Sequence, residues 1–299
     1  MMAGIKRIFF DANIFNRIVD RSDATELIGH LTQMQTAREI ELVTSIQVIE
    51  ELIVTPDLDK RKCLSDRVFM LIERKIIKPW NQLIREELWA CCREQEPSSI
   101  FYENDNQDVY SGVLKDIAEG RFSDQCGRIN EDLKKEKKHA LNRQKSLRKQ
   151  EKNTVGVHPC SNYQTFDEFY EQEWRSAGPN QVKKLLRKDG IEGSKLDEAV
   201  LRVASKQDRL PHLNAFLRVT PALTWADHVG WKQGPRRLAG PKFGDRTDLY
   251  HIVCAATSDV LASDDEKTRV VFGSVYPGKM ALPFKEFIST LGVQSENRM

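Results

Sequence analysis

The stretch IKRIFFDANIF, residues 5–15, decides the fold of this chain. Residues 5–10 are mostly apolar and end directly at Asp11, which predicts a buried strand with a carboxylate at its carboxyl end. Residues 13–19 then predict the start of a helix. A strand that runs straight into a helix is the first half of a parallel α/β unit.

The same alternation continues downstream. A helix is predicted over residues 23–36, with Ser22 or Asp23 as its N-cap. The short, β-branched segment ELVTS, residues 41–45, predicts a second strand, and IQVIEELI, residues 46–53, predicts the helix after it. Strand and helix therefore alternate twice in about 55 residues, which is the pattern of a parallel α/β sheet.

The alternation returns near the end of the chain. Residues 245–257 predict a helix, residues 259–263 and 270–273 predict strands, and residues 282–291 predict a closing helix. The expected fold class is therefore α/β, with a twisted, mostly parallel sheet that is supplied by both ends of the chain and flanked by helices. The expected core is discontinuous and comprises residues 1–56 and 241–299.

Between these two parts, residues 57–240 are expected to form a large, mostly helical insertion. Its helices are predicted, between breaks containing Pro, Gly and Ser, over residues 60–75, 80–94, 105–119, 121–152, 165–176, 180–188 and 194–206. We expect no strand and no internal repeat there. The segment 225–238 combines two Trp, one His and three basic residues, which fits either a loop packed against the core or a surface that stacks on bases.

The composition is that of a water-soluble globular protein. Of 299 residues, 40% are hydrophobic, and no stretch approaches the roughly 18 consecutive apolar residues of a membrane helix. The N-terminal apolar run meets Asp11 at once and lacks a small-residue cleavage site, so no signal peptide is expected. The six cysteines lack paired CxxC spacing, and His158 with Cys160 has no second ligand pair. We therefore expect a cytoplasmic protein with reduced thiols and no zinc site.

The net charge of +2 conceals one strongly basic segment. Residues 133–149 contain eight Lys or Arg and one Glu, a charge of +7, so the remaining chain carries 2 − 7 = −5. The surrounding basic helix, predicted at about residues 131–152, has too few apolar residues to bury a face, so it fits a solvated helix or a charge run. It also fits an arm that grips nucleic-acid phosphates. The basic residues of this arm are Lys134, Lys135, Lys137, Lys138, Arg143, Lys145, Arg148 and Lys149.

Carboxylates lie at four junctions between the predicted terminal strands and helices. They are, in chain order, Asp11, Glu50, Glu51, Asp245, Asp248, Asp264 and Asp265. In a parallel sheet with right-handed crossovers these strand ends share one edge, where ligands bind. A single Asp after a strand fits a helix cap equally well. Acidic residues at four strand-to-helix junctions, each within an otherwise apolar segment, indicate a functional site.

Clustered carboxylates favour the binding of a hard divalent cation. Like charges at close range raise one another's pKa, and a cation removes that cost. Mg²⁺ prefers oxygen ligands and is commonly held by one or two carboxylates together with waters and substrate phosphate. An ion held in this way can activate water and neutralise charge on a phosphodiester. The acids therefore predict metal-dependent hydrolysis of a phosphodiester.

The motifs around these acids resemble those of the PIN-domain nucleases, a family that includes the toxin ribonucleases of bacterial toxin–antitoxin pairs. FFDANIF is similar to the family's first apolar strand, which ends at an Asp and often has an Asn two residues on, here Asp11 and Asn13. VIEEL is similar to the second motif, with Glu51 in register and Glu50 as the alternative.

The third and fourth motifs of the family also have counterparts. DLYHIVCAA resembles the helix that begins at the third acid, here Asp248, and LASDD resembles the strand end at the fourth, here Asp265 after Ser263. All four motifs occur in the family's order. The separation of 248 − 51 = 197 residues between the second and third acids is far longer than in compact members, which is the reason to expect an insertion.

The resemblance implies a nuclease that depends on Mg²⁺ or Mn²⁺ and hydrolyses RNA internally with a metal-activated water. Asp11, Glu51, Asp248 and Asp265 would be metal ligands or would orient the water, and Asp245, one helical turn from Asp248, would support a second metal ion. Two further residues, Asn13 and Ser263, would hydrogen-bond the carboxylates from a second layer.

Two other functions fit the same residues. One is a nuclease of the same fold that acts on DNA or on structured nucleic-acid ends, and the other is a catalytically inactive nucleic-acid-binding scaffold. The presence of all four acids argues against the scaffold. His251, three residues after Asp248, fits packing better than catalysis. The sequence leaves open the oligomeric state and the existence of an inhibitory or complex-forming partner protein.

Overall fold

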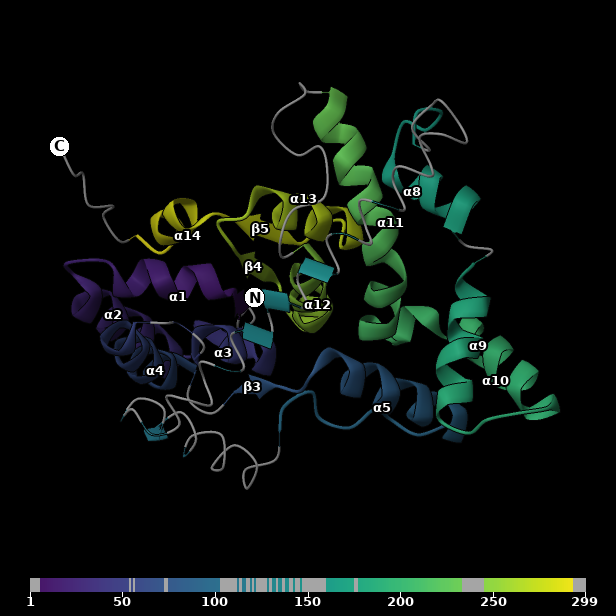
Figure 1. The fold of residues 1–299 in the computed structure, drawn as a ribbon, viewed down its shortest axis with the longest axis horizontal. Coiled ribbons are helices and arrows are strands. Elements are labelled where there is room, and N and C mark those ends of the chain that lie inside the picture. Colours follow the sequence, from purple (N-terminus) through teal and green to yellow (C-terminus); the bar gives the residue numbers. More distant parts are fainter. Residues whose placement is uncertain are drawn as a thin grey trace.

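A five-stranded sheet organises the chain, and all of its neighbouring strands are parallel (Figure 1). The structure is a computed structural model that describes residues 6–53, 55, 57–72, 75–102, 160–174, 177–232 and 245–292, and single positions between 112 and 146. The strands are β1 (Lys6–Phe10), β2 (Ile40–Ser45), β3 (Ile76–Ile77), β4 (Val260–Ala262) and β5 (Met280–Leu282). Their order is β3-β2-β1-β4-β5, so β1 is the central strand. The expected parallel α/β fold is confirmed.

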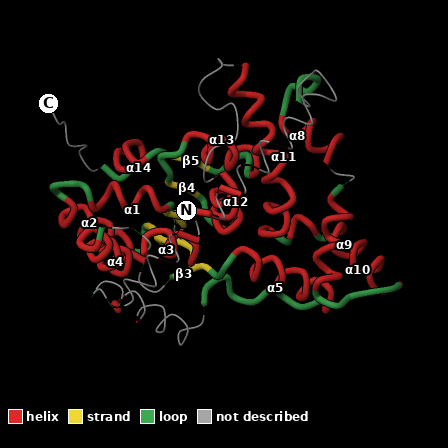
Figure 2. The backbone as a smooth tube through the Cα atoms, in the orientation of Figure 1, coloured by secondary structure: helices red, strands yellow, loops and turns green. Residues whose placement is uncertain are grey.

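Helices cover the sheet on two sides (Figures 1 and 2). Those that follow the strands are α1 (Ala12–Val19), α2 (Ala24–Thr36), α3 (Ile46–Ile53), α4 (Leu58–Ile72), α13 (Glu266–Val275) and α14 (Phe284–Thr290), and α12 (Asp245–Cys254) precedes β4. In Figure 1, α1, α2, α4 and α14 lie to one side of the column of strands, and α12 lies to the other. Both faces of β1 are therefore covered, which is why Ile8, Phe9 and Phe10 form one continuous buried run.

Further helices extend away from the sheet beyond α12 (Figure 1). They are α5 (Trp80–Arg93), α8 (Phe166–Phe169), α9 (Gly178–Lys188), α10 (Ser194–Ser205) and α11 (Pro211–Lys232). A π-helix continues α8 over Tyr170–Trp174, and a short 3-10 helix spans Gln207–Arg209. Most positions of the helices predicted at 105–119 and 121–152 lie outside the described residues.

One buried carboxylate joins two of these outer helices. Glu87 of α5 is 3% exposed and accepts hydrogen bonds from the backbone N–H groups of His212 and Leu213, at 3.1 Å and 2.8 Å. The Nδ1 of His212 lies 2.6 Å from the same carboxylate. Glu87 thus satisfies the first amides of α11, as a capping residue would, although it comes from another helix.

The predicted strand at 270–273 is wrong, because these residues belong to α13. Val271, Phe272 and Val275 are buried, and their spacing places them on one face of a helix. The strand in this part of the chain is β5, which pairs with β4 at the edge of the sheet. Its side chains are half-buried or exposed, so it lacks the apolar signal of an interior strand.

The expectation of no strand between residues 57 and 240 is also wrong. β3 lies in that region and pairs with β2 through Thr44–Ile76 and Ser45–Ile77, so the sheet uses residues outside the predicted core. Helix α11 was not expected either. It contains residues 225–232 of the segment 225–238, and Trp225, which is 8% exposed, packs against Phe169 and Phe166. For Trp225 the packing interpretation is confirmed.

Within the described part of the chain, no helix is both long and apolar enough to cross a lipid bilayer. The described cysteines Cys63, Cys91, Cys92, Cys160 and Cys254 carry free thiols.

Candidate active site

The strand order reverses at the centre of the sheet, between β1 and β4. β2 and β3 lie on one side of β1, whereas β4 and β5, from the other end of the chain, lie on the other. Ligands of open α/β sheets bind outside the carboxyl ends of the strands at such a switch point. Asp11 directly follows β1, and Ser263 directly follows β4, so both lie at this position.

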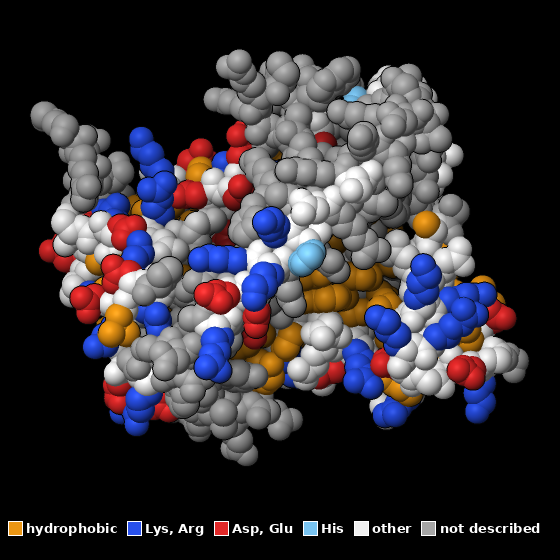
Figure 3. All heavy atoms as spheres, viewed as in Figure 1, with side chains coloured by type: hydrophobic (Ala, Val, Ile, Leu, Met, Phe, Trp, Pro, Cys, Tyr) orange, Lys and Arg blue, Asp and Glu red, His pale blue; other side chains and the backbone are white. Residues whose placement is uncertain are grey.

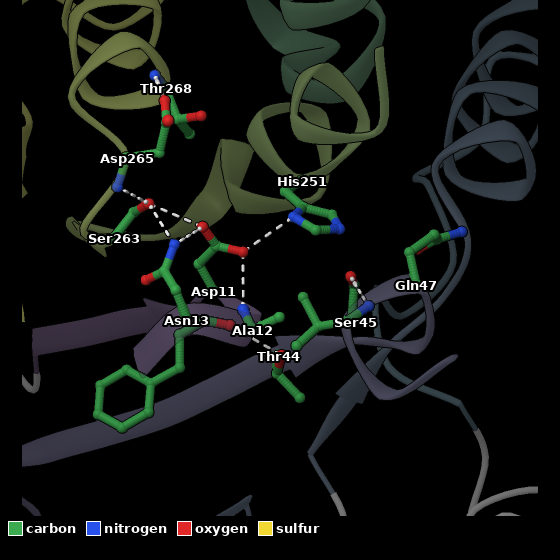
Figure 4. Close-up of polar contacts among 12 residues, drawn as sticks. Asp11, Ala12, Asn13, Thr44, Ser45, Gln47, His251, Ser263, Asp265 and Thr268 are labelled. Carbon is green, nitrogen blue, oxygen red and sulfur yellow. Dashed lines mark hydrogen bonds and ion pairs between the residues drawn. The ribbon is translucent and has the colours of Figure 1, made fainter. Parts of the chain in front are cut away.

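Asp11 is the most constrained carboxylate of the site (Figure 4). It is 5% exposed and caps α1, since its Oδ1 accepts a 2.7 Å hydrogen bond from the Ala12 amide. The other oxygen, Oδ2, accepts hydrogen bonds from the Asn13 side-chain amide at 2.8 Å and from the Ser263 hydroxyl at 2.7 Å. The predicted second-layer roles of Asn13 and Ser263 thus correspond to direct hydrogen bonds that orient Asp11.

His251 completes the set of contacts around Asp11. Its ring is fully buried, and its Nδ1 lies 3.0 Å from Asp11 Oδ1 (Figure 4). Burial alone would lower the pKa of the imidazole, but the hydrogen bond to Asp11 and the charges of Glu51, Asp11 and Asp248 raise it to about 9. The ring is therefore a cation at neutral pH and donates its Nδ1–H to Asp11.

The charge state of Asp11 is the counterpart of that of His251. Burial alone would raise the pKa of the Asp11 carboxyl group, but His251, Ser263 and the Ala12 amide together hold this pKa below its ordinary value. The pair is therefore ionic. His251 packs near Phe9, with ring centroids 6.5 Å apart, and it also binds the central carboxylate, a contact that the sequence did not predict.

The two neighbouring acids after β4 have different surroundings. Asp264 accepts a 2.9 Å hydrogen bond from the Phe284 amide and forms an ion pair with Arg17 at 2.7 Å. It therefore joins the start of α14 to α1. Asp265 is half-buried and caps α13, where its Oδ1 accepts a 2.7 Å hydrogen bond from the Thr268 amide. Asp264 thus has a structural role. Asp265 is the neighbour whose charge raises the pKa of Asp248.

Burial and electrostatic interactions also distinguish Glu50 from Glu51. Both lie on α3, where Glu50 is exposed and Glu51 is half-buried. The charge of Glu51 raises the pKa values of both Asp248 and His251. Burial, followed by the charge of Glu51, raises the pKa of Glu50. The geometry therefore favours Glu51 as the member of the acidic cluster.

Asp248 lies where the four acids interact. It is half-buried on α12, and burial is the largest cause that raises the pKa of its carboxyl group from 3.8 to about 8. Repulsion from Asp11, Glu51 and Asp265 acts in the same direction, while His251 opposes it. An acid with this pKa is mostly protonated at pH 7, because a further negative charge in the cluster is disfavoured, and a bound cation would remove that penalty.

Asp245 and most of the basic arm cannot be placed relative to this cluster. Asp245 begins α12, but its side chain lies outside the described residues. Of the predicted arm, Lys134, Lys135 and Lys138 are helical and exposed. The other members, Lys137, Arg143, Lys145, Arg148 and Lys149, lie outside the described residues.

The donor set fits a divalent cation of the Mg²⁺ class in its chemistry. The groups are carboxylate oxygens, and the raised pKa of Asp248 shows that its charged form is disfavoured unless a cation balances it. Among the described residues, no three carboxylate, imidazole or thiol groups already form a metal-binding cluster. Asp265 Oδ1 is bonded to the Thr268 amide, and both oxygens of Asp11 are hydrogen-bonded, so an ion would use the remaining lone pairs of these carboxylates.

The sequence motifs located Asp11, Asn13 and Ser263, and the structure brings these three into one hydrogen-bonded group. They did not reveal the role of His251, whose only sequence signal is its position three residues after Asp248, one turn along the same face of a helix. Comparison with protein-family models, with curated proteins and with solved structures finds no match to this chain.

Proposed function

We propose that this chain is a PIN-like, metal-dependent nuclease that cuts RNA internally. The observation that carries the proposal is the position of Asp248, half-buried at the carboxyl edge of the sheet and repelled by Asp11, Glu51 and Asp265. Burying carboxylates near one another costs free energy. Proteins retain such clusters mainly at functional sites, where the charges take part in binding or catalysis. The parallel sheet and its order, with acids at the switch point, agree with the motif resemblance.

Asp11, Glu51, Asp248 and Asp265 would hold the divalent cation, Mg²⁺ or Mn²⁺. When bound, the ion would supply a more acidic water and neutralise charge on the phosphodiester. Asp248 would lose its proton when the cation binds, because its pKa of about 8 lies near neutrality. Asp265 would keep Oδ1 on the Thr268 amide and would offer its other carboxylate oxygen to the ion.

The remaining polar residues prepare Asp11 for this role. Ser263 and Asn13 fix one carboxylate oxygen, and His251 fixes the other as its ion-pair partner. The carboxylate therefore stays ionised and in one orientation, which reduces the reorganisation needed to bind a cation. The basic arm would supply positive charge to substrate phosphates away from the acids.

The test is incubation of the purified protein with end-labelled RNA, single-stranded DNA and duplex DNA, each with Mg²⁺, Mn²⁺ or EDTA. We expect internal cleavage of RNA with either metal ion and no cleavage in EDTA. Cleavage of only a DNA substrate would replace RNA nuclease with DNA nuclease of the same fold. Absence of cleavage of every substrate would reject the catalytic proposal.

Two adjacent substitutions give a matched control. Glu51→Gln should abolish cleavage, whereas Glu50→Gln, on the exposed side of the same helix, should retain most of it. Both remove one negative charge, so a general electrostatic effect would change the two variants equally. Equal activities of the two variants would contradict the assignment of Glu51.

A further inference from the structure

Three aromatic rings stack in parallel beside the acidic site. Trp80 is the first residue of α5, Phe216 lies on α11, and Tyr250 lies on α12. The Trp80 and Tyr250 rings have centroids 4.3 Å apart and planes 6° from parallel. The Trp80 and Phe216 rings have centroids 5.5 Å apart and planes 9° from parallel. We call these three residues the aromatic stack.

The aromatic stack differs from the aromatic pairs of the core. Phe10 meets Phe15 and Phe287 at 71° and 85°, and these rings are fully buried. All three rings of the aromatic stack are only half-buried. Figure 3 shows hydrophobic side chains gathered at the surface where, in Figure 1, α5, α11 and α12 come together. A surface apolar patch of parallel rings is typical of a binding site.

The position of the aromatic stack ties it to the acids. Tyr250 is two residues from Asp248 on α12, about 3 Å along the helix axis at about 1.5 Å per residue. Residues two apart on a helix point in different directions. Tyr250 therefore lies on the opposite face of α12 from Asp248. The aromatic stack and the acids share the carboxyl edge of the parallel sheet, because Trp80 comes three residues after β3 and Asp11 directly follows β1. The helices α5, α11 and α12, which carry the stack, pack against one another.

Parallel aromatic rings at a surface match the flat face of a nucleobase. Single-stranded nucleic acids expose such faces, and proteins that bind them use aromatic side chains on which successive bases stack. Bases inside a duplex already stack on one another and expose only their edges in the grooves. A strand whose phosphodiester lies at the acids would carry its neighbouring base past the aromatic stack.

We propose that the aromatic stack of Trp80, Phe216 and Tyr250 binds an unpaired base next to the cleaved phosphodiester, so that the substrate is single-stranded. This proposal rests on the proposed nuclease function, since it assigns the substrate class of that site. It also gives α5 and α11 a role in recognition. Trp80 is the central ring of the aromatic stack, because it contacts both of the others.

The experiment measures binding in EDTA, where cleavage does not occur, by fluorescence anisotropy of labelled oligonucleotides. The probes are a single-stranded RNA, a duplex of the same sequence, and a single strand of equal length made of abasic residues. The proteins are the wild type, Trp80→Leu, Phe216→Leu and Trp80→Phe. The control is Trp89→Leu, because Trp89 lies half-buried on the same helix and contacts the Arg93 guanidinium at 4.7 Å.

We expect the wild type to prefer the single-stranded RNA over both other probes. Trp80→Leu should weaken binding of that RNA about 5-fold to 100-fold, the effect of losing about 1–3 kcal/mol of base stacking. It should bind the abasic strand as the wild type does. Phe216→Leu should act in the same direction, and Trp80→Phe should restore most of the affinity. Trp89→Leu should bind like the wild type.

The outcomes separate this proposal from the nuclease proposal. Cleavage of RNA by the wild type, with unchanged binding in correctly folded Trp80→Leu and Phe216→Leu, would overturn the role of the aromatic stack alone. Loss of single-strand binding in these variants, without cleavage by the wild type, would support the aromatic stack and reject the catalysis. Equal affinity of the wild type for the abasic and normal strands would overturn base stacking. Failure to bind any oligonucleotide would do the same and would point to a protein partner for the patch.

Discussion

Replacing Asp248 with Asn should make the metal-free protein more stable at neutral pH. The Asn amide has nearly the shape of the carboxyl group but never carries a charge. Asp248 has a pKa near 8 in the folded chain and 3.8 as its ordinary value, because burial and three neighbouring acids disfavour its charged form. The unfolded chain can ionise this group freely at pH 7, whereas the folded chain keeps it mostly protonated, and this difference destabilises the fold.

The size and sign of the effect follow from the two pKa values. Between 3.8 and about 8, the folded chain holds a proton that the unfolded chain has lost, so the free energy of unfolding falls as the pH rises. Each pH unit costs about 1.36 kcal/mol, which gives about 4 kcal/mol at pH 7. Burial of the amide offsets part of this gain, so we expect the substitution to stabilise by about 2–4 kcal/mol. That corresponds to an increase in Tm of about 4–8 °C at about 2 °C per kcal/mol.

The assay is thermal unfolding in EDTA from pH 4 to pH 8, followed by circular dichroism. The gap between the variant and the wild type should be near zero at pH 4 and should widen steadily up to pH 8. Asp66→Asn, at an exposed carboxylate on α4, serves as the control and should leave Tm unchanged at every pH. A variant that is less stable than the wild type at pH 7, or a gap that does not depend on pH, would refute the reasoning.

Other perturbations test separate parts of the structure. Ser263→Ala removes the 2.7 Å hydrogen bond to the Asp11 carboxylate and should lower the free energy of unfolding by about 1.5–3 kcal/mol in a urea titration. Glu87→Gln places an amide N–H₂ among the donors of His212 and the start of α11, and should cost about 1.5–3 kcal/mol in the same assay. An effect under about 0.5 kcal/mol in either variant would contradict the hydrogen-bond assignment. Changing Lys134, Lys135 and Lys138 to Gln should reduce the slope of log K against log salt for single-stranded RNA by up to about 0.7 per lost contact. An unchanged slope would reject the gripping role of the basic arm and leave the nuclease proposal intact.

The central strands β1 and β2 could be predicted because the residues that identify each strand lie within the strand itself. β1 and β2 are interior strands of a parallel sheet, so residues 8–10 of β1 and 42–45 of β2 are buried consecutively, and both segments contain apolar residues in succession. Asp11 follows such a run at a strand-to-helix junction, and its capping of α1 is visible in the sequence for the same reason. The edge strands β3 and β5, two and three residues long, were missed since so short a segment has no period to detect.

The errors and omissions elsewhere come from tertiary contacts. VVFG has strong strand propensity, but the cap at Asp265 and the packing of α13 against α11 make it a helix. His251 could be seen as a buried residue, yet its partner Asp11 is 240 residues away in the chain. The parallel rings of Trp80, Phe216 and Tyr250 come from three separate helices, so their stacking could not be predicted from any one segment.

The central position of β1 also determines when the protein can first become active during synthesis. The carboxylate of Asp11 and the hydroxyl of Ser263 that orients it are 252 residues apart. At roughly 5–20 residues per second, the ribosome makes Ser263 about 10–50 s after Asp11. During that interval the apolar β1 has no β4 beside it and depends on chaperones or on early helices for cover. A growing or prematurely ended chain therefore carries Asp11 without the Ser263 hydroxyl that orients it, so the proposed site would be incomplete until the end of synthesis.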